Sequence, residues 1–328
     1  MKMLLLTHAE VVHLLPMHEC IAVMEAALTE LARGEMYQPL RMIVKPPEAA
    51  GVMALMPAYK SGTSAIFALK AICVFPDNAA IGKDAHQGGV FLFSAETGEP
   101  LALMNASAIT TIRTAAVSGV ATRLLAREDA CELAIIGAGV QARSHLAAMA
   151  CVRPIKRTRV ASRTFAHAQK IVNELQTSFP FPLEAVESPR AAVNAADIVV
   201  TATTSLEPVL HRDWLAPGTH INAVGTYSPQ AREIDTATMA AASLFVDRRE
   251  SALNEAGDYL WAAGVGAIGP DHIRAEIGEI LIGSKSGRTS RNELTLFKSL
   301  GLAVEDLAAA AYLYRKAQQK QVGAWADF

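Results

Sequence analysis

A glycine-rich turn near the middle of the chain constrains the fold more than any other feature. The segment LAIIGAGVQA places Gly137, Gly139 and Ala142 in the pattern G-x-G-x-x-A, with an apolar strand before it and a helical segment after it. In that context the first glycine permits a tight turn, the second lets the backbone approach a pyrophosphate, and the alanine allows helix and strand to pack closely. The pattern therefore predicts a dinucleotide site; the alternative is a glycine-rich turn that binds nothing.

Apolar and helical segments alternate from residue 131 onward. We expect strands at ELAII, TRVASR, residues 183–186, DIVVTAT, THINAV and SLFVD, and helices at SHLAAMACV and AHAQKIVNELQ. Strands interleaved with helices indicate a parallel sheet that is covered on both faces. The sequence therefore predicts an α/β protein with a doubly wound parallel sheet in residues 119–302.

The first third of the chain has a different character. Residues 17–33 carry apolar side chains at i, i+3 and i+4 spacing and predict a helix. Between residues 38 and 104, short apolar segments rich in β-branched or aromatic residues predict an antiparallel sheet. Residues 107–126 are expected to form a helix with Ser107 as its N-cap. The alanine-rich segment from Ala303 to Gln319 predicts a further helix.

The charge balance narrows the class of protein. Thirty basic and 32 acidic residues give a formal charge of −2, without a long run of either sign. A nucleic-acid binder would show a basic stripe or arm, and with 6% aromatic residues a base-stacking surface is not expected either. No apolar run reaches the ~18 residues of a membrane span. The N-terminal segment MKMLLLTHAEVVHLL has no small-residue cleavage site, so we expect a cytoplasmic protein.

The four cysteines carry no metal or redox signature. Cys20, Cys73, Cys131 and Cys151 form no C-x-x-C or C-x-x-H pair and stand among apolar neighbours. They are interpreted as small buried residues of a reducing compartment, a redox or metal site being the alternative. We expect no bound metal.

The end of the second strand of the predicted parallel sheet indicates which dinucleotide binds. An acidic residue there would bind the ribose 2′-hydroxyl of NAD, but this chain has Ser162, Arg163 and Thr164. A guanidinium flanked by hydroxyls suits a 2′-phosphate. The sequence predicts NADPH as cofactor, with NADH possible but weaker; the alternative is that Arg163 is a solvated surface residue.

Three cations stand out in the first region. Arg41 opens the strand RMIVK, Lys70 interrupts the apolar segment AIFALKAICVF, and Arg113 interrupts a helix of Ala, Thr, Ile and Val. Such residues are rarely buried without a partner, and few acids lie between residues 38 and 118. Each alone is more often a surface side chain with a buried stem. Together, in a chain with a dinucleotide domain, they predict a site for an anionic ligand such as a carboxylate.

Several segments, in order and spacing, resemble the ornithine cyclodeaminase/mu-crystallin family, and most closely its ketimine reductase branch. They are DAHQGGVFLF, ITTIRTAAVSGVAT, LAIIGAGVQARSH, the SRT after the second strand, EPVL, GTHINAVG, AEIGEI and FKSLGLAVED. The resemblance implies a Rossmann domain in residues 119–302. It also implies a substrate-binding and dimerisation domain in residues 1–118, completed by a C-terminal helix in residues 303–328, with a homodimer formed through the sheets of these domains.

The resemblance also implies the site residues. Arg41, Lys70 and Arg113 would be the active-site cations that bind the substrate carboxylate, and His86 would lie near the nicotinamide. The residues at cofactor-binding positions are Arg113, Gly137, Ala138, Gly139, Val140, Gln141, Ser162, Arg163, Thr164, Thr203, Val224 and Ser299.

One departure from the family pattern bears on the reaction. Cyclodeaminases carry an Asp two residues after the glycine of the INAVG strand, where this chain has Tyr227. A phenol with a pKa near 10 does not replace a carboxylate base at neutral pH. The expected activity is therefore NADPH-dependent reduction of cyclic imino acids: Δ1-pyrroline-2-carboxylate to proline, and Δ1-piperideine-2-carboxylate to pipecolate. The alternatives are an ornithine cyclodeaminase, an alanine-type amino-acid dehydrogenase, or a non-catalytic NADPH-dependent binding protein.

Overall fold

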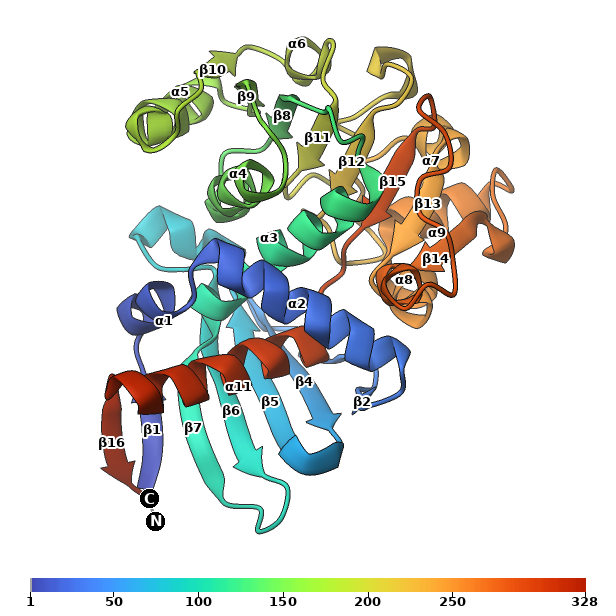
Figure 1. The fold of residues 1–328 in the computed structure, drawn as a ribbon. Coiled ribbons are helices and arrows are strands. Elements are labelled where there is room, and N and C mark those ends of the chain that lie inside the picture. Colours follow the sequence, from blue (N-terminus) through green and yellow to red (C-terminus); the bar gives the residue numbers. More distant parts are fainter. Residues whose placement is uncertain (1) are drawn as a thin grey trace. The chain divides into compact units, whose positions relative to one another are not determined.

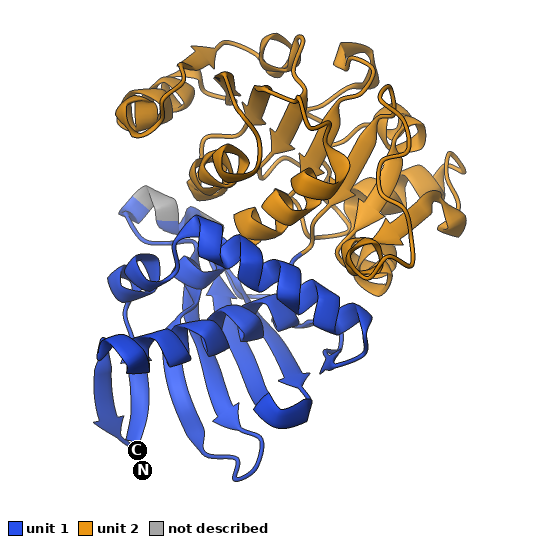
Figure 2. Ribbon diagram, viewed as in Figure 1, with its two compact units in different colours: residues 1–113, 301–328 blue, residues 114–300 orange. Residues whose placement is uncertain are grey.

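The computed structural model describes residues 2–328, apart from the side chains at positions 76, 79 and 80. The chain forms two compact units (Figures 1 and 2). Unit 1 comprises residues 1–113 and 301–328, and unit 2 comprises residues 114–300. The boundaries expected from the sequence, after residues 118 and 302, lie within a few residues of these. Each unit is built on its own sheet, and the predicted mixed α/β class is confirmed.

Unit 2 contains a parallel sheet with the strand order β10-β9-β8-β11-β12-β15-β13-β14. Its strands are β8 (Glu132–Ile136), β9 (Arg157–Ala161), β10 (Leu183–Val186), β11 (Ile198–Thr201), β12 (His220–Ala223), β13 (Ser243–Val246), β14 (Ile273–Glu276) and β15 (Thr295–Lys298). All strands predicted in this half are confirmed. The sequence reasoning missed β14 and β15, because each is only four residues long and ends in a charged residue.

Helices follow most strands of unit 2. They are α4 (Val140–Val152), α5 (Phe165–Leu175), α6 (Pro189–Val193), α7 (Thr236–Ala241), α8 (Arg249–Glu255), α9 (Gly257–Gly264) and α10 (Ile277–Leu281), with 3-10 turns η3 (Gln176–Ser178), η4 (Arg212–Trp214) and η5 (Pro270–His272). Helix α5 shows why they pack: Ala168, Ile171 and Val172 recur at helical spacing and are its buried residues. Strand β11 is buried along its whole length, as a strand covered on both faces must be.

The strand order of unit 2 locates its ligand-binding edge. Strand β8 lies between β9, which follows it in the chain, and β11, where the second half of the sheet begins. In doubly wound sheets, ligands bind outside the carboxyl ends of the strands at the point where the strand order reverses. That point in this chain is the turn after β8, which is the glycine-rich turn.

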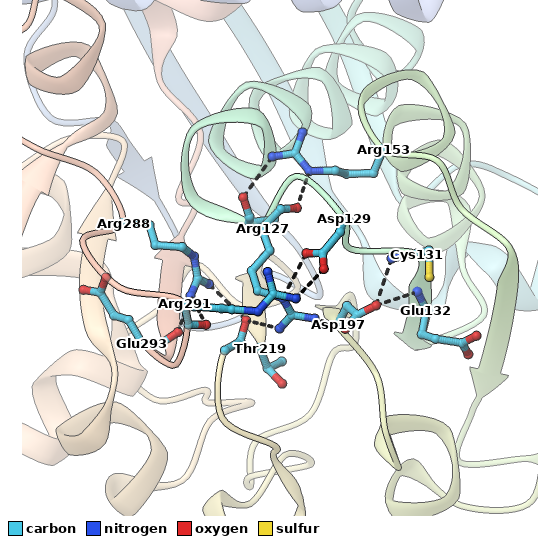
Figure 3. Close-up of polar contacts among 12 residues, drawn as sticks. Arg127, Asp129, Cys131, Glu132, Arg153, Asp197, Thr219, Arg288, Arg291 and Glu293 are labelled. Atoms are coloured by element: carbon cyan, nitrogen blue, oxygen red, sulfur yellow. Dashed lines mark hydrogen bonds and ion pairs between the residues drawn. The ribbon is translucent and has the colours of Figure 1, made fainter.

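Arginines fix the opposite edge of the same sheet to the end of α3 (Ala106–Leu125), the helix that begins in unit 1 and ends in unit 2 (Figure 3). Arg153 donates to the carbonyl oxygens of Thr122, Arg123 and Ala126, at 2.9, 3.0 and 3.0 Å. The carbonyl of Thr122 also accepts from the N–H of Ala126 at 2.9 Å, whereas the last carbonyls of a helix generally lack such a partner. Arg288 donates to the carbonyl of Leu125 at 2.6 Å. These contacts cap the C-terminal end of α3. The sheet edge opposite the glycine-rich turn is therefore occupied by contacts that stabilise the fold.

Unit 1 contains an antiparallel sheet extended by the two ends of the chain. Its strands are β1 (Lys2–Leu6), β2 (Met36–Tyr37), β3 (Met42–Val44), β4 (Val52–Lys60), β5 (Ile66–Val74), β6 (His86–Ser94), β7 (Pro100–Asn105) and β16 (Ala324–Asp327). Strands β4 to β7 pair with their neighbours in chain order and antiparallel, which confirms the predicted sheet. Strand β1 pairs parallel to β7 and antiparallel to β16, a pairing that the sequence reasoning did not predict.

Two long helices cover one face of this sheet, α2 (Met17–Ala32) and α11 (Ala303–Lys320) (Figure 1). The other helical segments of unit 1 are α1 (His8–Leu14), η1 (Gly62–Ser64) and η2 (Pro76–Ile81). On the opposite face the strands expose apolar side chains, among them Met42, Val44, Met53 and Phe67. The sheet of unit 1 is therefore covered on one face within this chain and apolar on the other.

Three sequence expectations about local structure are wrong. The last helix ends at Lys320 rather than continuing to residue 328, because Gln321 adopts a left-handed conformation (φ 56°). Ser107 is not the N-cap of α3: the side chain of Asn105 accepts from the Ala108 N–H at 2.9 Å. Among the cysteines only Cys20 is buried, and Cys151 is exposed at the end of α4.

Two further sequence expectations concern disulfides and membrane spans. All four cysteines lie in the described part of the chain and are free thiols. Within residues 2–328 no single helix has the length and hydropathy to cross a membrane; α1 and α2 pass that test only as a pair bent by 82°.

Candidate active site

Lys70 is buried in the middle of unit 1. It lies on β5, whose side chains alternate, so that Lys70 shares the helix-covered face with Ala68 and Ile72. Its Nζ lies 2.5 Å from Oδ2 of Asp306, in the first turn of α11. Both side chains are at most 2% exposed. The lysine that interrupts an apolar strand therefore has an internal counter-ion.

Arg113 joins the same group of charges. Its Nε donates to Oδ1 of Asp306 at 3.0 Å, and its Nη1 donates to Oε2 of Glu305 at 2.8 Å. The same Glu305 oxygen accepts from the N–H of Leu302, the N-cap of α11, at 3.1 Å. Two acids in a first helical turn also complement the positive end of the helix dipole. The start of α11 thus fixes the guanidinium in place.

Arg41 is linked to the same group of charges by a hydrogen bond to Gly301, which lies beside Arg113. Its Nη2 donates to the carbonyl oxygen of Gly301 at 2.9 Å. Gly301 has a positive φ of 77°, and a Cβ at this position would lie 2.7 Å from Nη1 of Arg113. Only glycine meets both conditions. We call Arg41, Lys70, Arg113, Glu305 and Asp306 the charge cluster.

The three cations, which predict a site for an anionic ligand, also have internal counter-ions that the sequence did not predict. Glu305 and Asp306 come from the other end of the chain, 192 and 193 residues after Arg113. Three cations against two carboxylates still leave one positive charge in excess. That excess matches one ligand carboxylate, so an anion is accommodated but not needed for folding.

The charge cluster sets the protonation state of Lys70. Burial lowers the pKa of Lys70 to about 8; the Asp306 carboxylate raises it and the Arg113 guanidinium lowers it further. Burial raises the pKa of Asp306, but Arg113 and Lys70 outweigh burial and hold it below its ordinary value. At neutral pH, Asp306 is therefore ionised and Lys70 carries a proton that it can release. A lysine with such a pKa is suited to acid–base work.

His86 is the first residue of β6 and is half-buried. Burial lowers its pKa below the ordinary value, and the charges of Lys70 and Arg113 lower it further. The histidine is therefore neutral at pH 7 and can donate or accept a hydrogen bond. Its pKa responds to two cations of the charge cluster, so the structure brings His86 within electrostatic reach of the predicted site residues.

In unit 2 the glycine-rich turn has the geometry that its sequence predicts. Gly137 has a φ of 123°, and a Cβ there would lie 2.3 Å from the carbonyl oxygen of Ala202. Gly139 is the N-cap of α4, and a Cβ there would meet nothing within 4 Å. Ala142 is fully buried in the first turn of α4. The turn is tight on one side and open on the other, as a pyrophosphate-binding turn must be.

The other predicted cofactor residues gather at the same edge of the sheet. Ser162 to Thr164 follow β9, and Thr164 is the N-cap of α5. Thr203, Val224 and Ser299 follow β11, β12 and β15, which are neighbours in the sheet. Arg163 is exposed at this edge. Tyr227, which stands where cyclodeaminases carry an Asp, is 39% exposed in the loop after β12.

Several buried charged residues of the two units were not predicted from the sequence. Glu305 and Asp306 lie in GLAVED, at the start of a helix, and their pairing with Lys70 and Arg113 is visible only in three dimensions. A signal was available for Lys298, which ends the apolar strand TLFK and yet is fully buried. A charged residue in a short apolar run was the feature that singled out Lys70, and it applies equally to Lys298.

The chain matches a known family and its members over nearly its whole length. The profile of the ornithine cyclodeaminase/mu-crystallin family matches residues 1–321. A Δ1-pyrroline-2-carboxylate reductase of Bacillus cereus is 38% identical over 327 residues, which are 99% of this chain and 100% of that protein.

Two solved structures have the same fold over nearly the whole chain. The Δ1-pyrroline-2-carboxylate reductase of Thermococcus litoralis, in complex with NADH and L-proline, is 41% identical with a TM-score of 0.95, covering 98% of this chain and 99% of that one. An archaeal alanine dehydrogenase dimer with bound NAD is 34% identical with a TM-score of 0.93, covering 100% of both chains. The resemblance noted in the sequence is confirmed: the chain belongs to the ornithine cyclodeaminase/mu-crystallin family.

Proposed function

We propose that this protein is an NADPH-dependent reductase of small cyclic imino acids, with Δ1-pyrroline-2-carboxylate, which gives proline, as the first substrate to test. The six-membered homologue, which gives pipecolate, is the second. The observation that carries the proposal is the charge cluster, which combines one excess positive charge with a lysine poised to release a proton. Relatives that cover the whole chain and act on or bind the same small molecules support it.

In this proposal the cations bind the substrate carboxylate. Arg113 is fixed by Glu305 and Asp306, so its orientation is set before the substrate arrives. Arg41 is held by the carbonyl of Gly301. A pre-oriented guanidinium forms charge-assisted bonds to a carboxylate at little entropic cost. The excess positive charge of the cluster favours one anion and disfavours a substrate without a carboxylate.

Lys70 has the role of proton donor. Reduction of a C=N bond adds a hydride to the ring carbon C2 and a proton to the ring nitrogen. A bound reduced nicotinamide supplies the hydride. Lys70 holds the proton, and burial has lowered its pKa to about 8, so it gives the proton up more readily than an exposed lysine. His86, neutral at pH 7, is proposed to position the nicotinamide ring by a hydrogen bond rather than to carry charge.

The residues at the carboxyl edge of the parallel sheet fit a dinucleotide. The tight turn at Gly137 and the open N-cap at Gly139 would hold the pyrophosphate, with the first N–H groups of α4 directed at it. Arg163, exposed after β9, would bind the 2′-phosphate of NADPH. The two solved relatives bind NADH and NAD. Preference for the phosphorylated cofactor is therefore the part of the proposal that rests on this chain's own Ser162, Arg163 and Thr164.

We also propose that the protein acts as a homodimer. The face of the unit 1 sheet opposite α2 and α11 exposes Met42, Val44, Met53 and Phe67, and an apolar face of that kind is typical of a permanent interface. A solved relative with full coverage is a dimer. The substitution Phe67→Glu tests this by light scattering after gel filtration: it should yield monomers if the face is the interface.

One comparison favours a second activity, that of an alanine-type amino-acid dehydrogenase. The archaeal alanine dehydrogenase covers the whole chain, and the charge cluster would bind the carboxylate of an open-chain imino acid equally well. NADPH oxidation should therefore be followed with cyclic imino acids alone and with keto acids plus ammonia. Faster turnover of a cyclic imino acid supports the proposal, whereas turnover only with pyruvate plus ammonia would replace it with the dehydrogenase.

A further inference from the structure

A second buried charge cluster lies in unit 2. Glu233 and Lys298 are fully buried and Asp258 is 1% exposed. They come from the loop after β12, from the end of β15 and from the start of α9. We call these three residues the Glu233 triad.

The carboxylate of Glu233 accepts hydrogen bonds from residues at the ends of two neighbouring strands, β11 and β12. Its Oε1 accepts from the N–H and the hydroxyl of Thr203, after β11, both at 2.7 Å. Its Oε2 accepts from the N–H of Gly225, after β12, at 2.7 Å and from the hydroxyl of Thr201 at 3.0 Å. A Cβ at Gly225 would lie 2.2 Å from the carbonyl oxygen of Thr203. The two loops are therefore in close contact, with one carboxylate as their shared acceptor.

Asp258 and Lys298 complete the arrangement. Oδ1 of Asp258 accepts from the N–H groups of Glu233 and Ile234 at 2.7 and 2.8 Å. Lys298 lies 2.7 Å from Oδ2 of Asp258 and donates to the carbonyl oxygen of Thr226 at 2.7 Å. Each member thus holds backbone of the loop after β12, which is the loop that carries Tyr227.

The position of the triad in the sheet relates it to the nicotinamide half of the cofactor. Doubly wound sheets bind a dinucleotide across the point where the strand order reverses, one nucleotide over each half. The half that contains β8 and β9 carries the pyrophosphate turn and Arg163. The other nucleotide would extend over the ends of β11 and β12, the two strand ends that Glu233 joins.

The triad carries a net negative charge. Two carboxylates against one ammonium leave one negative charge in excess. The pKa of Glu233 lies above its ordinary value, because burial raises it and the Asp258 carboxylate raises it further, while Lys298 and the hydrogen bonds from Thr203 oppose the rise. The N–H groups of Thr203 and Gly225 can only donate, and each faces a different oxygen of Glu233. This donor arrangement stabilises the ionised carboxylate.

We propose that Glu233 is a positioning residue for the nicotinamide: its carboxylate holds both loops at that end of the site, and its charge favours the oxidised, cationic ring over the neutral reduced one. Hydride donation leaves a positive charge on a nicotinamide ring, and a preorganised negative charge stabilises that charge as it develops. The inference rests on the proposed use of a nicotinamide dinucleotide. Glu233 does not touch the reacting atoms. It affects the rate of hydride transfer through its charge and through the positions of Thr203 and Gly225.

The test compares dissociation constants of NADP+ and NADPH for the full-length protein and its variants, by fluorescence and calorimetric titration. Glu233→Gln should weaken NADP+ more than NADPH and change their ratio by about tenfold or more, which is the effect of removing one unit charge within about 12 Å of the ring at an effective dielectric constant of about 20. Glu233→Asp keeps the charge and shortens the side chain, so it should weaken both forms and leave the ratio unchanged. An unchanged ratio in Glu233→Gln would overturn the proposed role of the charge.

Glu293→Gln is the matched control. Glu293 also accepts from backbone N–H groups, those of Thr289 and Ser290, but it precedes β15 at the opposite edge of the sheet. This variant should leave the NADP+/NADPH ratio unchanged even if it lowers stability; an equal change in both variants would reduce Glu233 to a structural role. If Glu233→Gln does not fold by circular dichroism, Asp258→Asn provides the same test, because it removes the other negative charge. Failure of the wild-type protein to bind either cofactor would instead refute the proposed function.

Discussion

The substitution Asp306→Asn tests how the charge cluster works. Asp306 bridges Lys70 at 2.5 Å and Arg113 at 3.0 Å, and all three side chains are at most 4% exposed. Asparagine keeps the shape but removes the charge, so three cations would face only Glu305. Breaking a buried ion pair by neutralising one partner costs about 3–5 kcal/mol. We expect the free energy of unfolding at pH 7, measured by urea titration, to fall by about that amount.

The same substitution should change two pH profiles. Lys70 has a pKa of about 8 in the folded protein and about 10.5 when unfolded. Between these values the unfolded state binds more protons, so this group makes stability rise with pH. Without Asp306 the pKa of Lys70 falls further, so the stability of the variant begins to rise with pH at a lower pH than that of the wild type. The difference in free energy of unfolding between wild type and variant therefore shrinks as pH increases. If protonated Lys70 is the donor, the alkaline fall of kcat/KM should move to lower pH as well.

Glu19→Gln is the control for a charge pair on α11, because Glu19 pairs with Lys316 of that helix near the surface. It should cost at most about 1 kcal/mol and leave the alkaline fall of kcat/KM unchanged. A loss below about 1 kcal/mol in Asp306→Asn, together with an unshifted pH profile, would refute the view that Asp306 compensates Lys70 and Arg113.

Three further substitutions have defined outcomes. Arg163→Ala should weaken NADPH roughly tenfold to a hundredfold by titration and barely change NADH affinity; equal losses would show that Arg163 does not bind the 2′-phosphate. Gly301→Ala places a Cβ 2.7 Å from Nη1 of Arg113 at a positive φ, so KM for the imino acid should rise strongly; an unchanged KM would show that the Arg113 geometry is not critical. Arg153→Met removes the cap of α3 and should lower the thermal unfolding midpoint while KM stays unchanged; a raised KM would contradict a purely structural role.

Sequence reasoning succeeded where the signal is local. The strands of unit 2 are short apolar runs separated by helical segments, and the glycine-rich turn is read within six residues, so both follow from neighbours in the chain. Strands β14 and β15 escaped because four residues with a charge at the end carry little periodicity. The N-cap of α3 was misplaced by two residues, since Ser107 and Asn105 are both good caps and only the structure distinguishes them.

The site required contacts that no local pattern contains. Lys70 and Arg113 were recognised as unusual because each interrupts an apolar segment, but their counter-ions lie in α11, 192 and 193 residues later than Arg113. Glu233 gave no signal either, because an acid in a loop is ordinary, and its burial depends on the convergence of β11, β12 and α9. Long-range pairing of charges determines these sites, and pairing partners cannot be assigned from spacing.

The most direct test of the central claim is a product measurement. Purified protein, NADPH and Δ1-pyrroline-2-carboxylate are combined, and NADPH consumption is followed together with proline formation by mass spectrometry. One proline should form for each NADPH consumed, and Lys70→Met should lower kcat more than it changes KM. Absence of proline formation by a wild-type protein that binds NADPH would refute the proposed reductase activity.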